Sequence, residues 1–184
     1  MKPAGEKYFL ALVPPAPVYD AVMALKEEFR EAYGSKAALR SPPHLTLHMP
    51  FTWPDKKLPQ LVDALARFAV GRAPVEVVLD GFGAFPPSVI FVAVRENLAL
   101  RELQRALSTF ARQQLGLLAP DYKDRGFHPH ITIAFRDLKR AAFETAWPTF
   151  QERPFTGTFH ANRLVLLRHT GKVWEVFREF GFSR

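Results

Sequence analysis

Two five-residue segments of this sequence share one pattern, and their repetition constrains the fold more than any other feature. Residues 43–47 and 129–133 each read proline, histidine, apolar, threonine, apolar, and their histidines are 86 residues apart. Successive side chains of a β-strand point to opposite faces, so each segment would present its His and Thr together and its aliphatic pair on the other side. We therefore expect two half-buried strands with the same role.

The elements expected around the two segments follow a similar order in each half of the chain. Hydrophobic alternation and turn residues predict strands at 7–13, 44–49, 75–82, 89–94, 130–133, 155–159, 163–168 and 173–180. Helical spacing of apolar residues predicts helices at 18–33, 58–70, 98–115 and 139–150, with loops at 51–54 and 119–127. This order favours an α+β fold of two similar lobes, each a small sheet with helices on its outer face.

No linker rich in glycine, serine or charge separates the two halves, so we expect one bilobal domain over residues 1–184. The two motif strands would lie side by side near a pseudo-two-fold axis. The repeated order indicates an internal duplication.

Composition narrows the class of protein. A chain of 184 residues with 48% hydrophobic content can bury the core of an ordinary soluble domain. The absence of cysteine excludes disulfides and thiolate metal sites and fits a cytoplasmic protein. The first apolar run is short and followed by prolines, so we expect neither a signal peptide nor a membrane span. The net charge of +7 favours polyanionic partners.

A single His-x-Thr in a strand is more often structural than catalytic, but two copies in matching surroundings favour a functional role. In the first copy, alternation would place His44, Thr46 and His48 on one face, opposite Leu45 and Leu47. A core face would not normally carry three polar side chains in a row, because each buried polar group needs a partner. We therefore expect this face to line a site.

The two motifs resemble those of the two-histidine phosphoesterase superfamily, which contains the RNA 2',3'-cyclic phosphodiesterases also called 2'-5' RNA ligases. That family is defined by two His-x-Thr/Ser-x motifs, matched here by His44-Leu45-Thr46-Leu47 and His130-Ile131-Thr132-Ile133. The resemblance extends over nearly the whole chain. It implies a bilobal α+β fold, two antiparallel sheets and a central, positively charged groove between the motifs.

The resemblance also implies a reaction, namely metal-independent hydrolysis of a 2',3'-cyclic phosphate or transfer at a 2'-5' phosphodiester. The implied partners are RNA ends or small nucleotides that carry a cyclic phosphate, with no cofactor and no obligate protein partner. By analogy, His44 is the acid toward the 2'-oxygen and His130 the base that activates water, although the symmetry of the motifs leaves the opposite assignment open. Thr46 and Thr132 would donate hydrogen bonds to phosphate oxygens.

Other candidates for substrate binding surround the motifs. They are two arginines before the histidines, two histidines beside them and two aromatic residues after the first strand, where a base could stack: Arg40, Arg125, His48, His128, Phe51 and Trp53. Each has a structural alternative as a solvated charge or a packed neighbour. We expect Phe135, which follows the second strand, to pack in the core.

Two other function classes stay open. Four histidines at 44, 48, 128 and 130 could suggest a zinc hydrolase, but residues four apart on a strand lie about 13 Å from each other, too far for one metal ion. We therefore assign no metal ligand. A module that binds RNA or nucleotides without turnover is the other alternative, although both motifs are intact. The sequence does not decide between hydrolysis and ligation.

Overall fold

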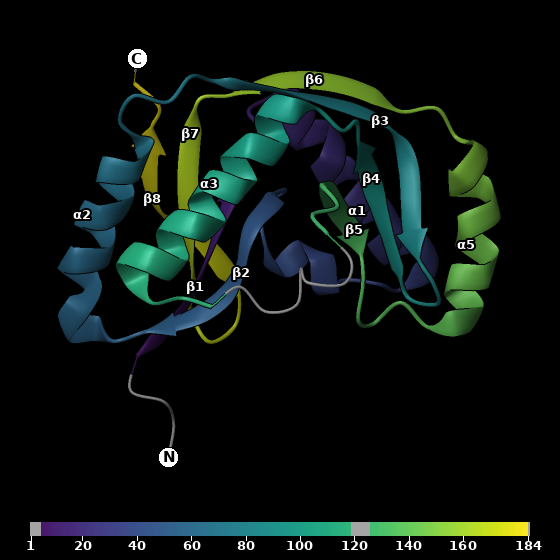
Figure 1. Ribbon diagram of the computed structural model, residues 1–184. Helices are drawn as coiled ribbons and strands as arrows, with labels where there is room; N and C mark the ends of the chain where they lie inside the picture. Colours follow the sequence, from purple (N-terminus) through teal and green to yellow (C-terminus); the bar gives the residue numbers. More distant parts are fainter. Residues whose placement is uncertain (1–4, 119–125, 184) are drawn as a thin grey trace.

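The computed structural model describes residues 5–118 and 126–183 and has two four-stranded sheets flanked by helices (Figure 1). The strands are β1 (Glu6–Leu12), β2 (Leu45–Trp53), β3 (Val75–Phe85), β4 (Val89–Val94), β5 (His130–Ala134), β6 (Thr156–Ala161), β7 (Arg163–His169) and β8 (Trp174–Gly181). The longer helices are α1 (Val18–Tyr33), α2 (Leu58–Ala69), α3 (Leu98–Leu115) and α5 (Arg140–Glu152), with short 3₁₀ turns η1 (Ala37–Arg40) and η2 (Asp55–Lys57).

Both sheets have a motif strand at one edge. The first sheet has the order β2-β1-β7-β8 and the second β5-β4-β3-β6, and all neighbouring strands are antiparallel. The strands β2 and β5 are in contact but share no strand pairing. The motif strands thus face each other as the edges of two separate sheets, which refines the expected side-by-side arrangement.

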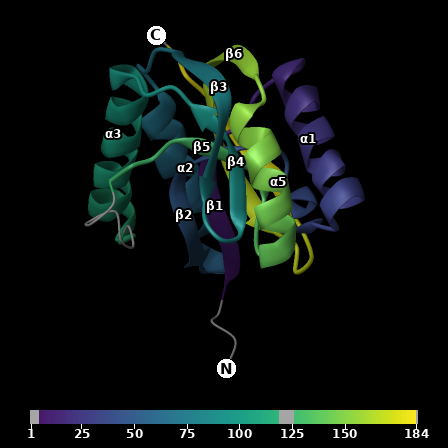
Figure 2. The same cartoon turned by 90° about the vertical axis from the view of Figure 1, so that its right-hand side faces the viewer.

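Two helices pack against the sheet to which their neighbouring strands do not belong. Helix α1 follows β1 of the first sheet but packs on β5 and β6 of the second, whereas α3 follows β4 of the second sheet and packs on β2 of the first as well as on β3. Figure 2 shows the strands between α3 on one side and α1 and α5 on the other. The two lobes are therefore interleaved, and neither lobe is simply one half of the sequence.

Local sequence signals fix where these helices begin and end. The side chain of Asn97 accepts a hydrogen bond from the N–H of Leu100 at 2.8 Å, which caps the start of α3. Helix α1 ends at Tyr33, and the next residue, Gly34, has a left-handed φ of 69° and donates its N–H to the carbonyl of Arg30. These signals explain why the expected start of α3 and the expected end of α1 agree with the structure.

One hydrophobic core draws on both sheets and on the four longer helices. A smaller cluster of Phe9, Ala11, Val165 and Leu167 lies on the opposite face of the first sheet, with Trp174 packed against it. The first sheet therefore has two apolar faces, because Leu10 and Leu12 of the same strand belong to the main core. The α+β fold with two antiparallel sheets is as expected, and the single domain over 1–184 stays a prediction that the shared core supports.

Strand β2 is longer than expected. It continues to Trp53, whereas the sequence suggested a loop at 51–54. The pairing of Phe51, Thr52 and Trp53 with the start of β1 accounts for the extension. In the described part of the chain, no helix is long and apolar enough to cross a membrane.

Candidate active site

The two motifs line one cavity of about 590 Å³. His44 and Thr46 come from the start of β2, and His130 and Thr132 come from β5. All four side chains are half-buried, so they are partly shielded from water yet reachable. The rest of the lining is largely apolar: Phe9, Ala38, Ser41, Met49, Pro50, Phe85, Gly126, Phe127, His128, Phe135, Arg136 and Trp174.

Each motif imidazole is held by the carbonyl group two residues before it. Nδ1 of His44 lies 2.7 Å from the carbonyl oxygen of Pro42, and Nδ1 of His130 lies 2.7 Å from that of His128. A carbonyl oxygen can only accept a hydrogen bond, so Nδ1 carries the proton in both rings. Nε2 is then the nitrogen that gains or loses a proton. The two motifs are thus alike in tautomer as well as in sequence.

A β-bulge follows the threonine in each motif strand. Thr46 and His48 pair with the consecutive residues Ala11 and Leu10 of β1, which leaves Leu47 as an extra residue. Ile133 is the extra residue at the matching place in β5, between Thr132 and Ala134. A bulge changes the face to which the following side chains point. Consequently, the residues after each bulge alternate differently from the simple strand pattern.

The bulge explains why the expectation for His48 was wrong. His48 is only 2% exposed, does not line the cavity and makes an edge contact with Phe51 at a ring distance of 5.5 Å. Its Nδ1 bonds to the carbonyl of Met49 at 2.9 Å. Met49 and Pro50 line the cavity instead, in the positions that Phe135 and Arg136 occupy after β5. The pseudo-symmetry thus extends beyond the motifs.

Aromatic side chains support the two imidazoles. The rings of Phe9 and His44 are 4.8 Å apart, and Trp174 packs edge-on against Phe9 at 4.7 Å. On the other side, the ring of Phe91 lies 4.9 Å from that of His130. These contacts limit the rotation of each imidazole and exclude water from part of its surface.

Burial shifts the proton equilibria of both histidines. It lowers the pKa of His44 to about 4. The hydrogen bond to Pro42 acts in the opposite direction and raises this pKa, whereas the charges of Lys26 and His130 lower it further by smaller amounts. Burial also lowers the pKa of His130. Both imidazoles are therefore mainly neutral in the free protein at pH 7. A bound phosphate anion would raise the pKa of an adjacent imidazole, because opposite charge favours the protonated form.

Arg136 brings a positive charge to the cavity. Its φ of 61° is left-handed, and the N–H of Asp137 bonds to the carbonyl of Phe135 at 2.7 Å, so Arg136 is the centre of a tight three-residue turn. Asp137 anchors this turn to the segment before η1 by accepting bonds from the Ser35 hydroxyl at 2.8 Å and the Lys36 N–H at 2.9 Å. This anchored, strained turn places Arg136 in the lining of the cavity, with its guanidinium carbon 5.1 Å from the centre of the Phe135 ring.

Of the remaining residues considered in the sequence analysis, some line the cavity and others do not. His128 lines the cavity as expected, and Phe135 lines it although core packing was expected. Trp53 is 9% exposed, donates from Nε1 to the carbonyl of Lys57 at 2.8 Å and lies outside the cavity.

The outcomes for the other candidates differ. Phe51 is half-buried against Tyr8 and His48, and Arg40 is exposed; neither lines the cavity. The expectation for Arg125 lies outside the described residues.

Sequence reasoning missed Arg136, Phe85 and Trp174 as lining residues. The matching positions after the two motifs, Met49-Pro50 and Phe135-Arg136, are a signal that could have found Arg136. Phe85 and Trp174 come from β3 and β8, and only the sheet order brings these strands to the cavity.

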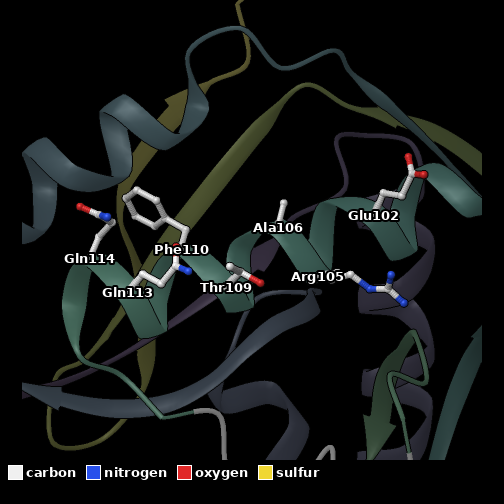
Figure 3. A pocket seen from close by; sticks show the side chains of 7 residues that line it. All are labelled: Glu102, Arg105, Ala106, Thr109, Phe110, Gln113 and Gln114. Atoms are coloured by element: carbon white, nitrogen blue, oxygen red, sulfur yellow. The ribbon is translucent and has the colours of Figure 1, made fainter.

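A second hollow of about 530 Å³ lies along α3 (Figure 3). Its lining is one helix face with a mixture of charged, amide and apolar side chains: Glu102, Arg105, Ala106, Thr109, Phe110, Gln113 and Gln114. It contains no imidazole and neither motif. The chemistry suggested by the sequence therefore belongs to the cavity between β2 and β5.

The zinc hydrolase alternative lacks a ligand set in the described ranges, 5–118 and 126–183. No group of three or more His, Asp or Glu side chains gathers there in a way that could hold a metal ion. His48 in particular lies in the core, away from the other histidines of the motifs.

Two edge strands that face each other, each with one histidine and one threonine, define the class of two-histidine phosphoesterases. The family model of the 2'-5' RNA ligase superfamily matches residues 14–173. The chain therefore belongs to this superfamily, and the resemblance seen in the motifs is confirmed.

Relatives and solved structures agree with this assignment. A protein of Geobacillus sp. strain WCH70 named "Putative phosphoesterase" is 32% identical in an alignment of 178 positions that covers 95% of each chain. The crystal structure of TT0787 of Thermus thermophilus is similar at 25% identity with a TM-score of 0.69, covering 96% of this chain and 97% of that one. LigT of E. coli complexed with 3'-AMP shares the fold at 20% identity and a TM-score of 0.71, covering 98% and 99%.

Proposed function

We propose that this phosphoesterase hydrolyses 2',3'-cyclic phosphates at RNA ends or on small nucleotides and leaves a 2'-phosphate, without a metal ion. One observation carries the proposal. The two Nε2 atoms are the free nitrogens of two equivalently held imidazoles, and each shares one cavity with a threonine hydroxyl. One imidazole can accept a proton while the other donates one.

The reaction needs three kinds of group, and the cavity contains all of them. A neutral imidazole takes a proton from water as the water oxygen attacks phosphorus. The bond from phosphorus to the ribose 3'-oxygen breaks, and the second imidazole, protonated at Nε2, gives its proton to that oxygen. The hydroxyls of Thr46 and Thr132 donate to the non-bridging oxygens, where charge develops.

This product corrects one detail of the analogy with the family. An acid directed toward the 2'-oxygen would leave a 3'-phosphate, whereas a 2'-phosphate requires protonation of the 3'-oxygen. The near symmetry of the two motifs does not by itself assign the acid and the base to His44 and His130. If the 5'-hydroxyl of an RNA replaces water as the attacking group, the same step forms a 2'-5' linkage. Ligation is therefore a second reaction that the proposed site could support.

The lining fits a nucleotide. Arg136 is the cation nearest in sequence to the second motif among the described lining residues, and it can pair with phosphate. Phe85 and Trp174 offer apolar ring faces on which a base can stack. Structures of LigT are complexed with 3'-AMP and with ATP, which supports a nucleotide ligand for the fold. A cytoplasmic location stays a prediction.

Turnover of a 2',3'-cyclic nucleotide and of a short RNA with a cyclic end, measured in excess EDTA, tests the proposal. We expect a 2'-phosphate product, identified by its ³¹P spectrum, and loss of turnover in His130→Ala. His160→Ala is the matched control, because this histidine is exposed on β6 and lies outside the cavity. Binding without turnover, unchanged by His130→Ala, would instead favour the binding module. Inhibition by EDTA that zinc reverses would favour the metal hydrolase.

A further inference from the structure

The most unusual charged group outside the motifs is Lys26 of α1, which is 1% exposed. Its Nζ donates to the carbonyl oxygens of Ala38 and Ser41, both at 2.9 Å. No carboxylate forms an ion pair with Lys26 among the described residues. A buried ammonium group is costly unless it is well paired. Its place in this fold therefore calls for a reason beyond packing.

The two carbonyls that Lys26 binds belong to the segment that leads into the first motif. Ala38 and Ser41 both line the cavity. The next residue after Ser41 is Pro42, whose carbonyl holds Nδ1 of His44. The ammonium group is thus connected to the imidazole through consecutive peptide groups and no mobile side chain.

Asp137 holds the other end of the same segment. Its carboxylate accepts bonds from the Ser35 hydroxyl and from the N–H groups of Lys36 and Ala37, at 2.8 to 3.0 Å. The segment 35–42 is therefore fixed at one end by a carboxylate that accepts from N–H and hydroxyl groups, and at the other by an ammonium group that donates to carbonyl groups. The acceptor carboxylate thus bonds to backbone donors, and the donor ammonium group bonds to backbone acceptors.

The charge of Lys26 bears on one motif histidine. It is among the causes that lower the pKa of His44, whereas burial and the charge of His128 lower that of His130. Lys26 therefore distinguishes two imidazoles that backbone carbonyl groups hold in the same way.

We propose that Lys26 is a positioning residue of the active site, which fixes segment 38–42, sets the orientation of His44 and disfavours a positive charge on that imidazole. This inference rests on the proposed function for its kinetic effects only. The groups that act on the charge of His44 are Lys26 from α1, His130 from β5 and the carbonyl of Pro42. The Nζ of Lys26 faces the carbonyls of Ala38 and Ser41.

The protonation of Lys26 is itself poised near neutrality. Burial lowers its pKa to about 7, while two carbonyl acceptors favour the ammonium form. Loss of its proton would weaken both bonds to segment 38–42 and remove the charge that disfavours imidazolium at His44. Because the charge of Lys26 acts on His44 and is not among the causes that shift His130, its removal should change the titration of His44 alone.

Lys26→Met tests the inference, because methionine fills similar space without donors or charge. Titration of both imidazoles by ¹H–¹⁵N NMR should show the pKa of His44 rising by about 0.5 to 1 unit, with that of His130 unchanged. If the proposed reaction occurs, kcat should fall about 10-fold through misplacement of His44, with KM within about twofold. Lys36→Met is the matched control, since Lys36 lies in the same segment with an exposed side chain.

Unchanged titration of His44 in folded Lys26→Met would overturn the inference. If that variant does not fold, Lys26→Gln retains an amide NH₂ donor group without the charge and should show the same direction of shift in His44. The NMR titration needs no substrate, so it separates the two proposals. A shift at His44 in a protein that hydrolyses no cyclic phosphate would refute the proposed function and leave the role of Lys26 in place.

Discussion

Gly83 of β3 lies directly opposite Phe91 of β4, and the Phe91 ring occupies the space that a Cβ at position 83 would need. The same ring packs against His130 at 4.9 Å. The absence of a side chain at Gly83 therefore lets Phe91 support the second motif imidazole.

Gly83→Ala should push the Phe91 ring toward His130 and disturb the site. We expect kcat for a 2',3'-cyclic nucleotide to fall about 10- to 100-fold, the loss typical of a misplacement near 1 Å. Gly181→Ala is the control, because a Cβ there would meet no neighbouring atom. Equal kcat values for wild type and Gly83→Ala would show that Phe91 does not position His130.

Arg136→Gln should weaken phosphate binding more than the chemical step. Removal of a charge-assisted contact worth about 1.5 to 3 kcal/mol corresponds to a rise in KM of about 10- to 100-fold, with kcat less affected. The salt dependence of kcat/KM should also become shallower. Lys139→Gln serves as the control, since this nearby cation lies outside the cavity. A fall in kcat with KM unchanged would contradict a binding role for Arg136.

Asp137→Asn should reduce stability in a manner that depends on pH. Burial alone would raise the pKa of Asp137, but bonds from Lys36, Ser35 and Ala37 hold it below its ordinary value. Because the pKa of Asp137 is lower in the folded state, its ionised carboxylate stabilises the fold fully when the pH is above about 3.9, the pKa of Asp in the unfolded chain. This stabilisation is lost as the pH falls through the pKa of Asp137 in the folded state.

Thermal unfolding of wild type and Asp137→Asn, compared at pH 7 and at pH 3, measures this contribution. A loss of about 1 kcal/mol in the free energy of unfolding would lower Tm by about 2 to 4 °C at pH 7. The difference in Tm between wild type and Asp137→Asn should be smaller at pH 3. A Tm difference that is the same at both pH values would point to packing rather than charge.

The rate should depend on pH through both histidines. Because burial lowers the pKa of His44 to about 4 and also lowers that of His130, the bell-shaped profile of kcat/KM should have its maximum below about pH 6.5. The alkaline limb reports loss of the donor's proton, and the acid limb reports protonation of the acceptor. A flat profile between about pH 5 and 8 would count against the histidine pair.

The sequence predicted the helices and most strands because helical spacing, capping residues and alternation are local properties. The boundary of β2 was misplaced because the pairing of Trp53 with Glu6 is not local. The orientation of His48 was wrong because the bulge at Leu47 depends on registry with β1. A strict alternation of period two cannot anticipate such a bulge.

The candidate site was predictable only where the two motifs define it. His44, Thr46, His130 and Thr132 line one cavity, although their catalytic roles stay a proposal. The contributions of Phe85 and Trp174 depend on how distant strands are arranged in the two sheets, and the proposed role of Lys26 depends on how α1 packs against the segment before the first motif. A single sequence contains no local signal for either arrangement.

The most direct test of the central claim is kcat/KM for a 2',3'-cyclic nucleotide in His44→Ala, His130→Ala and the double variant, compared with wild type. If the two imidazoles act together in one step, each single change should cost about 100- to 10,000-fold, and the double variant should be little worse than either. Losses that multiply in the double variant would mean separate roles in separate steps. Full activity in either single variant would contradict the two-histidine account.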